Sequence, residues 1–268
     1  MAKLGANFDF TGSLGNISAY KMRGVDGTIL RRKGGASRDK VLHSPDMEGT
    51  RKGISEFSGR ANAGQWVRQL LHRQQPMAGF NITGAINSLM TPIQKLDTEG
   101  PFGQRHILIS KAPWLLEGFS LNKETGFDTI IRTPLAWSIS KETLSARIDV
   151  PALLPGINFF VSEKYSMFSL IATLGIVPDF FYSEHGYRPS TRAYGLNQLG
   201  IMNTVDTPWT PVLQGAPLLP IELKLGFTPP DQSFSLLLAI GIRYGSMAGA
   251  NTVQQVKHAG AAKILGMG

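Results

Sequence analysis

Histidine, acidic and hydroxyl side chains are the residues of this sequence that could catalyse a reaction or hold a metal. The sequence lacks cysteine, which excludes thiol nucleophiles, iron–sulfur clusters and cysteine zinc sites. The serines of GFSLN and MFSLI lack the flanking glycines of a hydrolase nucleophile elbow. The five histidines are dispersed along the chain, and none has a partner at metal-ligand spacing: His43, His72, His106, His185 and His258. We therefore predict a protein that is not an enzyme and needs no metal or organic cofactor.

The polar segment 181–200 is the one place where an acid and a base are neighbours in the sequence. Glu184 and His185 would form an acid–base pair there, although a solvated surface loop accounts for them more simply. The segment also carries three tyrosines, a residue type that is enriched in interfaces. These tyrosines would either form a binding loop or pack the loop onto its own domain: Tyr182, Tyr187 and Tyr194.

Positive charge is concentrated in the first quarter of the chain. Residues 1–75 hold 13 Lys/Arg against 6 Asp/Glu, a net charge of +7, while residues 76–268 hold 14 against 13, a net charge of +1. Such asymmetry is typical of an interaction segment. Six cations of this region are candidates for salt-sensitive phosphate contacts: Arg23, Arg31, Arg32, Lys33, Arg38 and Lys40. The alternatives are a solvated arm, or cations that meet acidic groups of a partner subunit.

Residues 15–35 carry most of this basic cluster and have the pattern of a β-hairpin. The Asp26-Gly27 pair favours a two-residue type I′ turn, because both central positions need positive φ. A two-stranded hairpin is marginal in water, so it must pack on its own domain, a neighbouring copy or a polyanion. We predict an intersubunit arm whose apolar contacts are Ile17, Tyr20, Met22, Ile29 and Leu30.

Two helices should follow the arm. Ser44 and Pro45 form a typical helix start, a capping hydroxyl with proline at the first helical position. The apolar stripe expected on this first helix comprises Ile54, Phe57, Ala61, Gly64, Val67, Leu70 and Leu71. Its many small residues indicate that another backbone packs close to it. The second helix should run from Ile82 to Leu96, antiparallel to the first.

From about residue 100 the apolar period changes to that of strands. The clearest is Leu144–Val150, in which apolar and polar residues alternate, and turn signals recur at the spacing of a sandwich or barrel. Other strands are expected at 106–110, 115–121, 135–139, 168–177, 221–227, 234–244 and 253–264. We predict a mainly β protein with three segments: a basic hairpin arm at 1–43, a helical pair at 44–99 and an antiparallel β-sandwich or barrel-like domain at 100–268.

Several stretches resemble a β-rich family that is abundant in Bacteroidota genomes. The resemblance is carried by FTGSLGNISAYKMRGVDGTILRRKGGAS and EGTRKGISEFSGRANAG, and later by LSARIDVPALLPGINFF, SLIATLGIVPDFFY and SFSLLLAIGIRYGS. No activity is established for that family. The resemblance therefore implies a protein synthesised in the cytoplasm, with no known cofactor, and it supplies no catalytic residues.

The leading functional hypothesis is a self-assembling structural subunit of a homopolymer, such as a filament, tube or shell, whose arm docks on neighbouring copies by strand addition. An alternative that we favour less is a nucleic-acid-associated or capsid-like protein that uses the basic arm. A third is a carbohydrate-binding or enzymatic module that uses segment 181–200. The start of the sequence lacks the apolar core of a signal peptide, and no apolar run is long enough to span a membrane. We expect cytoplasmic synthesis, without an indication of the final location.

Overall fold

The computed structural model describes residues 2–3, 10–22, 25–162, 164–190, 194–195, 199–249 and 252–268. Contacts within the chain define two compact units, Met1–Arg51 and Lys52–Gly268, which we call the small unit and the large unit. The boundary falls inside the long helix α2 (Glu48–Leu70). Antiparallel strands dominate both units, so the predicted fold class is confirmed: a mainly β protein with an N-terminal hairpin and a helical segment.

The small unit is built on a four-stranded antiparallel sheet with strand order β1-β4-β3-β2. Its strands are β1 (Ala2–Lys3), β2 (Gly12–Leu14), β3 (Ile17–Lys21) and β4 (Thr28–Arg32). The helix α1 (Arg38–His43) follows, and the Ser37 side chain caps it by accepting a hydrogen bond from the Lys40 backbone N–H at 3.2 Å. The hairpin predicted from the sequence is β3–β4, and it has a further strand on each side.

The turn of this hairpin differs from the prediction. β3 and β4 pair Lys21 with Thr28, so residues 22–27 form the connection instead of a two-residue turn at Asp26-Gly27. The predicted register would set Lys21 directly opposite Arg32, and like charges in that position destabilise a sheet. In the observed register Arg32 lies opposite an isoleucine instead. Arg23, a predicted phosphate contact, lies outside the described residues.

A two-residue turn does occur in the small sheet, one strand earlier. Leu14 pairs with Ile17, which leaves Gly15 and Asn16 as the turn between β2 and β3. Gly15 has φ +56°, a conformation that glycine adopts without steric cost. Gly-Asn is a known signal for a tight hairpin, so this turn could have been found from the sequence.

The start of α2 also differs from the prediction. Pro45–Met47 form one 3₁₀ turn, the α-helix begins at Glu48, and the Ser44 side chain makes no capping hydrogen bond. The Ser44 backbone carbonyl instead accepts a hydrogen bond of 2.8 Å from the Arg51 side chain.

The buried face of α2 is not the predicted stripe in the first half of the helix. Ile54 and Phe57 are exposed, while Glu56 and Gly59 are buried. The reason is that Glu56 forms an ion pair with Arg105, which follows α3 in the chain, and this pair holds that side of α2 in the interior. In the second half the prediction is correct for Gly64, Val67, Leu70 and Leu71.

The helix α3 (Thr83–Lys95) runs antiparallel to α2, as predicted. Later residues of α2 meet earlier residues of α3: Arg60 donates to Gln94 Oε1 at 3.1 Å, and Arg68 donates to Asn87 Oδ1 at 2.8 Å. Gly59 and Gly64 of α2 do lie against close neighbours, but these are side chains and not a second backbone, and Gly53 has no neighbour within 4 Å of a built Cβ. A Cβ at Gly59 would come within 2.7 Å of the Tyr187 ring.

The large unit contains three antiparallel sheets. A five-stranded sheet has the order β10-β7-β13-β14 with β11 paired to β7, a three-stranded sheet has the order β12-β6-β5, and β8–β9 is a separate hairpin. The strands are β5 (Ala136–Ser140), β6 (Ser145–Val150), β7 (Met167–Pro178), β8 (Phe180–Ser183), β9 (Gly186–Pro189), β10 (Met202–Asp206), β11 (Thr210–Pro211), β12 (Leu219–Lys224), β13 (Phe234–Gly249) and β14 (Thr252–Met267).

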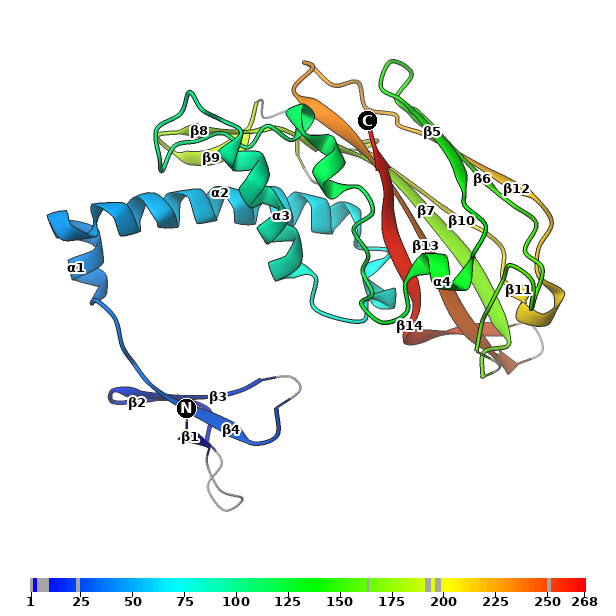
Figure 1. The fold of residues 1–268 in the computed structure, drawn as a ribbon, viewed down its shortest axis with the longest axis horizontal. Coiled ribbons are helices and arrows are strands. Elements are labelled where there is room, and N and C mark those ends of the chain that lie inside the picture. Colours follow the sequence, from blue (N-terminus) through cyan, green and yellow to red (C-terminus); the bar gives the residue numbers. More distant parts are fainter. Residues whose placement is uncertain are drawn as a thin grey trace. The chain divides into compact units, whose positions relative to one another are not determined.

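The five-stranded sheet is buried on both faces (Figure 1). On one face α2 packs against it: Trp66 Nε1 donates to the backbone carbonyl of Ile176 at 2.8 Å, and Leu70 lies against Gly175. On the other face the three-stranded sheet packs, with Trp137 of β5 against Gly266 of β14. A strand buried on both faces needs a continuous apolar run, and β7 and β13 have one.

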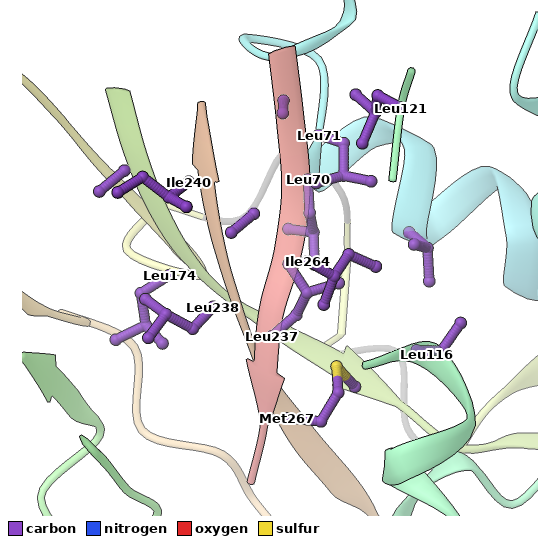
Figure 2. Close-up of a cluster of buried hydrophobic side chains, with 14 of the residues drawn as sticks. Leu70, Leu71, Leu116, Leu121, Leu174, Leu237, Leu238, Ile240, Ile264 and Met267 are labelled. Carbon is purple, nitrogen blue, oxygen red and sulfur yellow. The ribbon is translucent and has the colours of Figure 1, made fainter. Parts of the chain in front are cut away.

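Helices and sheets of the large unit share one hydrophobic core. Figure 2 shows Leu70, the last residue of α2, and the following Leu71 on one side of the strands, and Leu174 of β7 with Leu238 of β13 on the other. The division into arm, helical pair and sandwich therefore describes the order of the elements along the chain, while the contacts join α3 and the sheets into one unit.

In the large unit two predicted strands are wrong, and the strands β8, β9, β10 and β11 were missed. Residues 106–110 and 115–121 contain short 3₁₀ turns, Ile109–Lys111 and Pro113–Leu116, and form only isolated bridges to other strands. Both segments contain buried apolar residues, and this burial, without a regular strand, produced the strand-like pattern. Conversely, the predicted polar loop 181–200 begins with the hairpin β8–β9.

No helix in the described part of the chain is both long enough and apolar enough to cross a membrane.

Candidate functional site

The predicted assembly residues lie on both faces of the small sheet. Side chains alternate along a strand, so Ile17 and Leu30 belong to one face, while Tyr20 and Ile29 belong to the other. Ile17 is 39% exposed and Met22, just after β3, is 45% exposed. Ile29 is only 5% exposed and is used within the chain. Tyr20 and Leu30 are half-buried. Of the five, Ile17 and Met22 are the most exposed.

The structure adds Leu14, which the sequence reasoning missed. It lies in β2 directly opposite Ile17 and is 70% exposed. Leu14, Ile17 and Leu30 share one side of the sheet, which we call the apolar face of the small sheet, and the register places the cations Lys21 and Arg32 at its margins on the same side. Its edge strand is β2, whose outer side pairs with no described strand. Recognising the Gly15-Asn16 turn would have revealed this neighbour of Ile17.

The small unit buries very few side chains. Among its described residues only Ala19, Thr28 and Ile29 are buried. Isolated units of about 40–60 residues are marginal even with a well-filled core, because the conformational entropy lost on folding is large. Among its described residues, the small sheet therefore combines an ordered hydrogen-bond pattern with three buried side chains and several exposed apolar ones.

The predicted phosphate contacts do not form one surface. Arg31 and Arg32 are consecutive in β4, so their side chains leave opposite faces of the sheet. Lys33 Nζ donates to the backbone carbonyl of Gly15 at 3.1 Å. Arg38 and Lys40 lie on α1, and both are exposed. The described cations therefore spread over the two faces of the sheet and a helix instead of following one phosphate backbone.

Segment 181–200 uses its tyrosines for packing within the large unit. Tyr187 is buried, and its hydroxyl accepts a hydrogen bond from Gln94 Nε2 at 3.2 Å. Tyr182 packs edge-on against Tyr187, with ring centroids 5.4 Å apart. Tyr194 is buried and donates to Asp231 Oδ1 at 3.0 Å. Burial raises the pKa of Tyr187 to about 12. These contacts favour the packing interpretation of the tyrosines.

The acid and base of the same segment form a turn. Glu184 and His185 are the two residues between β8 and β9, and both are exposed. The pKa of a catalytic acid or base is usually shifted by burial or a charged neighbour, and neither of these exposed residues has a described ion-pair partner. The geometry is that of a surface turn.

A buried ion pair connects α2 to the chain beyond α3. Glu56 is 2% exposed and accepts two hydrogen bonds from Arg105, at 2.6 and 2.7 Å, and a third from the Gly103 backbone N–H at 3.1 Å. Burial alone would raise the pKa of Glu56, but these hydrogen bonds and the charges of Arg105 and Arg60 outweigh it and lower the pKa. All of these partners are groups of the chain itself, so we assign the pair a structural role.

A pocket of about 540 Å³ in the large unit combines aromatic rings with cations. Tyr165 and Tyr244 stack with their centroids 4.5 Å apart. Lys123 Nζ lies 4.7 Å from the centroid of the Phe80 ring, and Lys164 Nζ lies 5.0 Å from that of Tyr165. The remaining lining residues are Gly79, Asn122, Glu124, Thr125, Ile130, Phe160, Ser162, His258, Ala259 and Gly260. We call this the aromatic–basic pocket.

An irregularity of the five-stranded sheet forms one side of this pocket. β13 pairs Arg243 with Gly260 and then Gly245 with Gln255, which leaves residues 256–259 bulged out of the ladder. His258 in this bulge has φ +57°, an uncommon conformation for a residue with a side chain. Bulges of this kind re-aim side chains and are frequent beside functional sites.

A second pocket, of about 560 Å³, lies between the end of α2 and the start of β10. Its cation is Arg68, whose pKa is lowered by burial and whose guanidinium is engaged by Asn87. The other pocket offers two lysines and stacked rings, so its chemistry is more specific. Among the described residues no group of three or more histidine or carboxylate side chains is placed to hold a metal ion.

Neither a scan of protein-family models nor searches of curated proteins and solved structures found a match to this chain. The family resemblance drawn from the sequence therefore stays a prediction, and the function rests on the geometry of this chain.

Proposed function

We propose that this protein is a self-assembling structural subunit, and that its small unit docks on another copy through the apolar face of the small sheet and the open edge of β2. The observation that carries the proposal is the small number of side chains that the small unit buries, three among the described residues. Leu14 and Ile17 stand exposed on one face of this sheet. Their burial in a contact would contribute about 3–5 kcal/mol before the cost of ordering.

We propose that a second copy of the chain covers the apolar face and the edge of β2. The large unit carries another open edge, β5, which pairs only with β6 among the described strands. Trp137 of β5 remains 39% exposed. Natural proteins rarely leave a strand edge uncovered, because unpaired N–H and C=O groups attract other strands. β2 and β5 are thus two of the terminal strands among the described sheets, and contacts between copies can cover both without a second kind of protein.

Light scattering and negative-stain microscopy of the full chain test the proposal. The wild type should form particles larger than a monomer, and the fraction of protein in these particles should rise with protein concentration. The double variant Leu14→Asp with Ile17→Asp should stay monomeric, because it places two charges on the apolar face. The matched control is Ser13→Asp with Ser18→Asp, which puts the same charges on the same two strands but on the opposite face. The control should assemble like the wild type.

Two results would overturn the proposal. One is a wild-type chain that remains monomeric at high concentration, and the other is assembly that the Leu14 and Ile17 substitutions do not affect. A monomer that binds DNA or RNA with an affinity that falls steeply with salt would favour the nucleic-acid alternative instead. In that case Arg31→Ala and Arg32→Ala should each reduce the salt dependence.

A further inference from the structure

We infer that the aromatic–basic pocket binds a small anionic ring compound, one in which a carboxylate or phosphate is attached to a ring of monosaccharide size. The pocket lies wholly within residues 79–260 of the large unit. This inference is independent of the assembly proposal, because no described residue of the small unit lines the pocket. Its volume of about 540 Å³ falls in the range of small-molecule sites, which is roughly 300–1,000 Å³.

The charge of the pocket selects an anion. Lys123, Lys164 and His258 line it, and Glu124 is the one described carboxylate among its lining residues. Neither lysine forms an ion pair with a described carboxylate, and each ammonium group lies over an aromatic ring instead. A cation held over a ring keeps its charge, and an incoming carboxylate or phosphate can form charge-assisted hydrogen bonds with it.

The aromatic walls select a ring-bearing body for that anion. Phe80, Phe160 and Tyr165 are only partly buried, so each retains surface that a ligand can cover. Such surface contributes binding energy to sugar or base rings but none to a bare inorganic ion. Arg132 covers Phe160 at 3.6 Å from the ring centroid, which leaves Phe80 and Tyr165 as the rings next to the pocket lysines.

Tyr244 provides a polar group that has no other described use. Its side chain is 5% exposed and makes no hydrogen bond to another described residue. Tyr244 lines the pocket together with Tyr165, on which its ring stacks. A hydroxyl so placed is suited to a hydrogen bond with a ligand hydroxyl or acid group.

Isothermal titration of the full chain against five compounds tests the inference: glucuronate, glucose 6-phosphate, adenosine monophosphate, glucose and inorganic phosphate. At least one of the first three should bind about tenfold or more tightly than both glucose, which lacks the charge, and inorganic phosphate, which lacks the ring. Which of the three binds best distinguishes an acidic sugar from a nucleotide. If none of them binds, or if glucose or inorganic phosphate binds as tightly, the inference is wrong.

Variants link any binding to this pocket. Lys123→Gln with Lys164→Gln should weaken binding at least about tenfold, because two charge-assisted contacts are lost. The control, Lys111→Gln with Lys224→Gln, removes the same charge from lysines outside the pocket and should leave binding unchanged. Tyr244→Phe keeps the stacked ring and should weaken binding about three- to tenfold. Equal binding by the pocket pair and the control pair would overturn the assignment even if the wild type binds.

Discussion

The two units of this protein use their residues in different ways. In the large unit β7 and β13 are buried along most of their length, because α2 covers one face of their sheet and a second sheet covers the other. In the small unit four strands together enclose three described side chains. The large unit therefore has an extensive core, whereas the described residues of the small unit have the hydrogen-bond pattern of a sheet with few buried side chains.

Glycine shows the same difference. In the large unit Gly175 and Gly241 face neighbours so close that a Cβ would meet Leu70 at 2.6 Å or Met77 at 3.1 Å, so glycine there makes room for packing. In the small unit Gly15 and Gly35 have positive φ and no atom within 4 Å of a built Cβ. Glycine there permits turns. Glycine is thus required by close packing in the large unit and by the backbone conformation of turns in the small unit.

The largest expected effect on the free energy of unfolding comes from a substitution that creates a cavity in the large unit. Leu238→Ala removes a fully buried side chain between the two sheets and should lower the free energy of unfolding by about 3–4 kcal/mol. Ile29→Ala in the small unit should leave this free energy unchanged within about 0.5 kcal/mol. Urea denaturation followed by tryptophan fluorescence measures it selectively, because all four tryptophans lie in the large unit. A comparable loss in Ile29→Ala would show that the units unfold together.

The buried ion pair should give the next largest effect. Glu56→Gln leaves the Arg105 guanidinium without its carboxylate and should cost about 3 kcal/mol at pH 7. The control Glu222→Gln breaks an exposed pair with Arg147 and should cost less than about 1 kcal/mol.

The same pair predicts a dependence on pH. The folded-state pKa of Glu56 is lowered, so its contribution is present above the ordinary glutamate pKa and is lost as the pH falls through the lower folded value. The difference in stability between wild type and Glu56→Gln should therefore be constant from pH 7 to about 5 and shrink below about 4. A difference that grows on acidification would contradict the lowered pKa.

The smallest expected effects come from two glycines of α2 with opposite surroundings. Gly59→Ala places a methyl group against the Tyr187 ring and should destabilise the large unit by about 1–2 kcal/mol. Gly53→Ala meets open space and should stabilise the helix by about 0.5–1 kcal/mol, since alanine has the higher helix propensity. Urea denaturation of both variants measures the two changes in the free energy of unfolding. Equal effects of the two would show that Tyr187 moves aside without cost.

Several elements could be predicted from the sequence because their signal is local. The alternation in β6 correctly placed Ala146, Ile148 and Val150 on the buried side. The helical spacing of α3 correctly placed Ile86, Met90 and Ile93 in the core. In both elements the side chains that pack together follow the period of the backbone, so a run of about ten residues contains the information.

The sequence by itself thus determined the helical pair, most of the long strands, the mainly β class and the concentration of positive charge near the N-terminus. Only the tertiary structure decided which face of α2 turns inward, because Glu56 finds Arg105, and Gly59 meets Tyr187, far along the chain. It also created the aromatic–basic pocket, where Tyr165 stacks on Tyr244. Such sites depend on distances between residues far apart in sequence, and local periodicity contains no information about those distances.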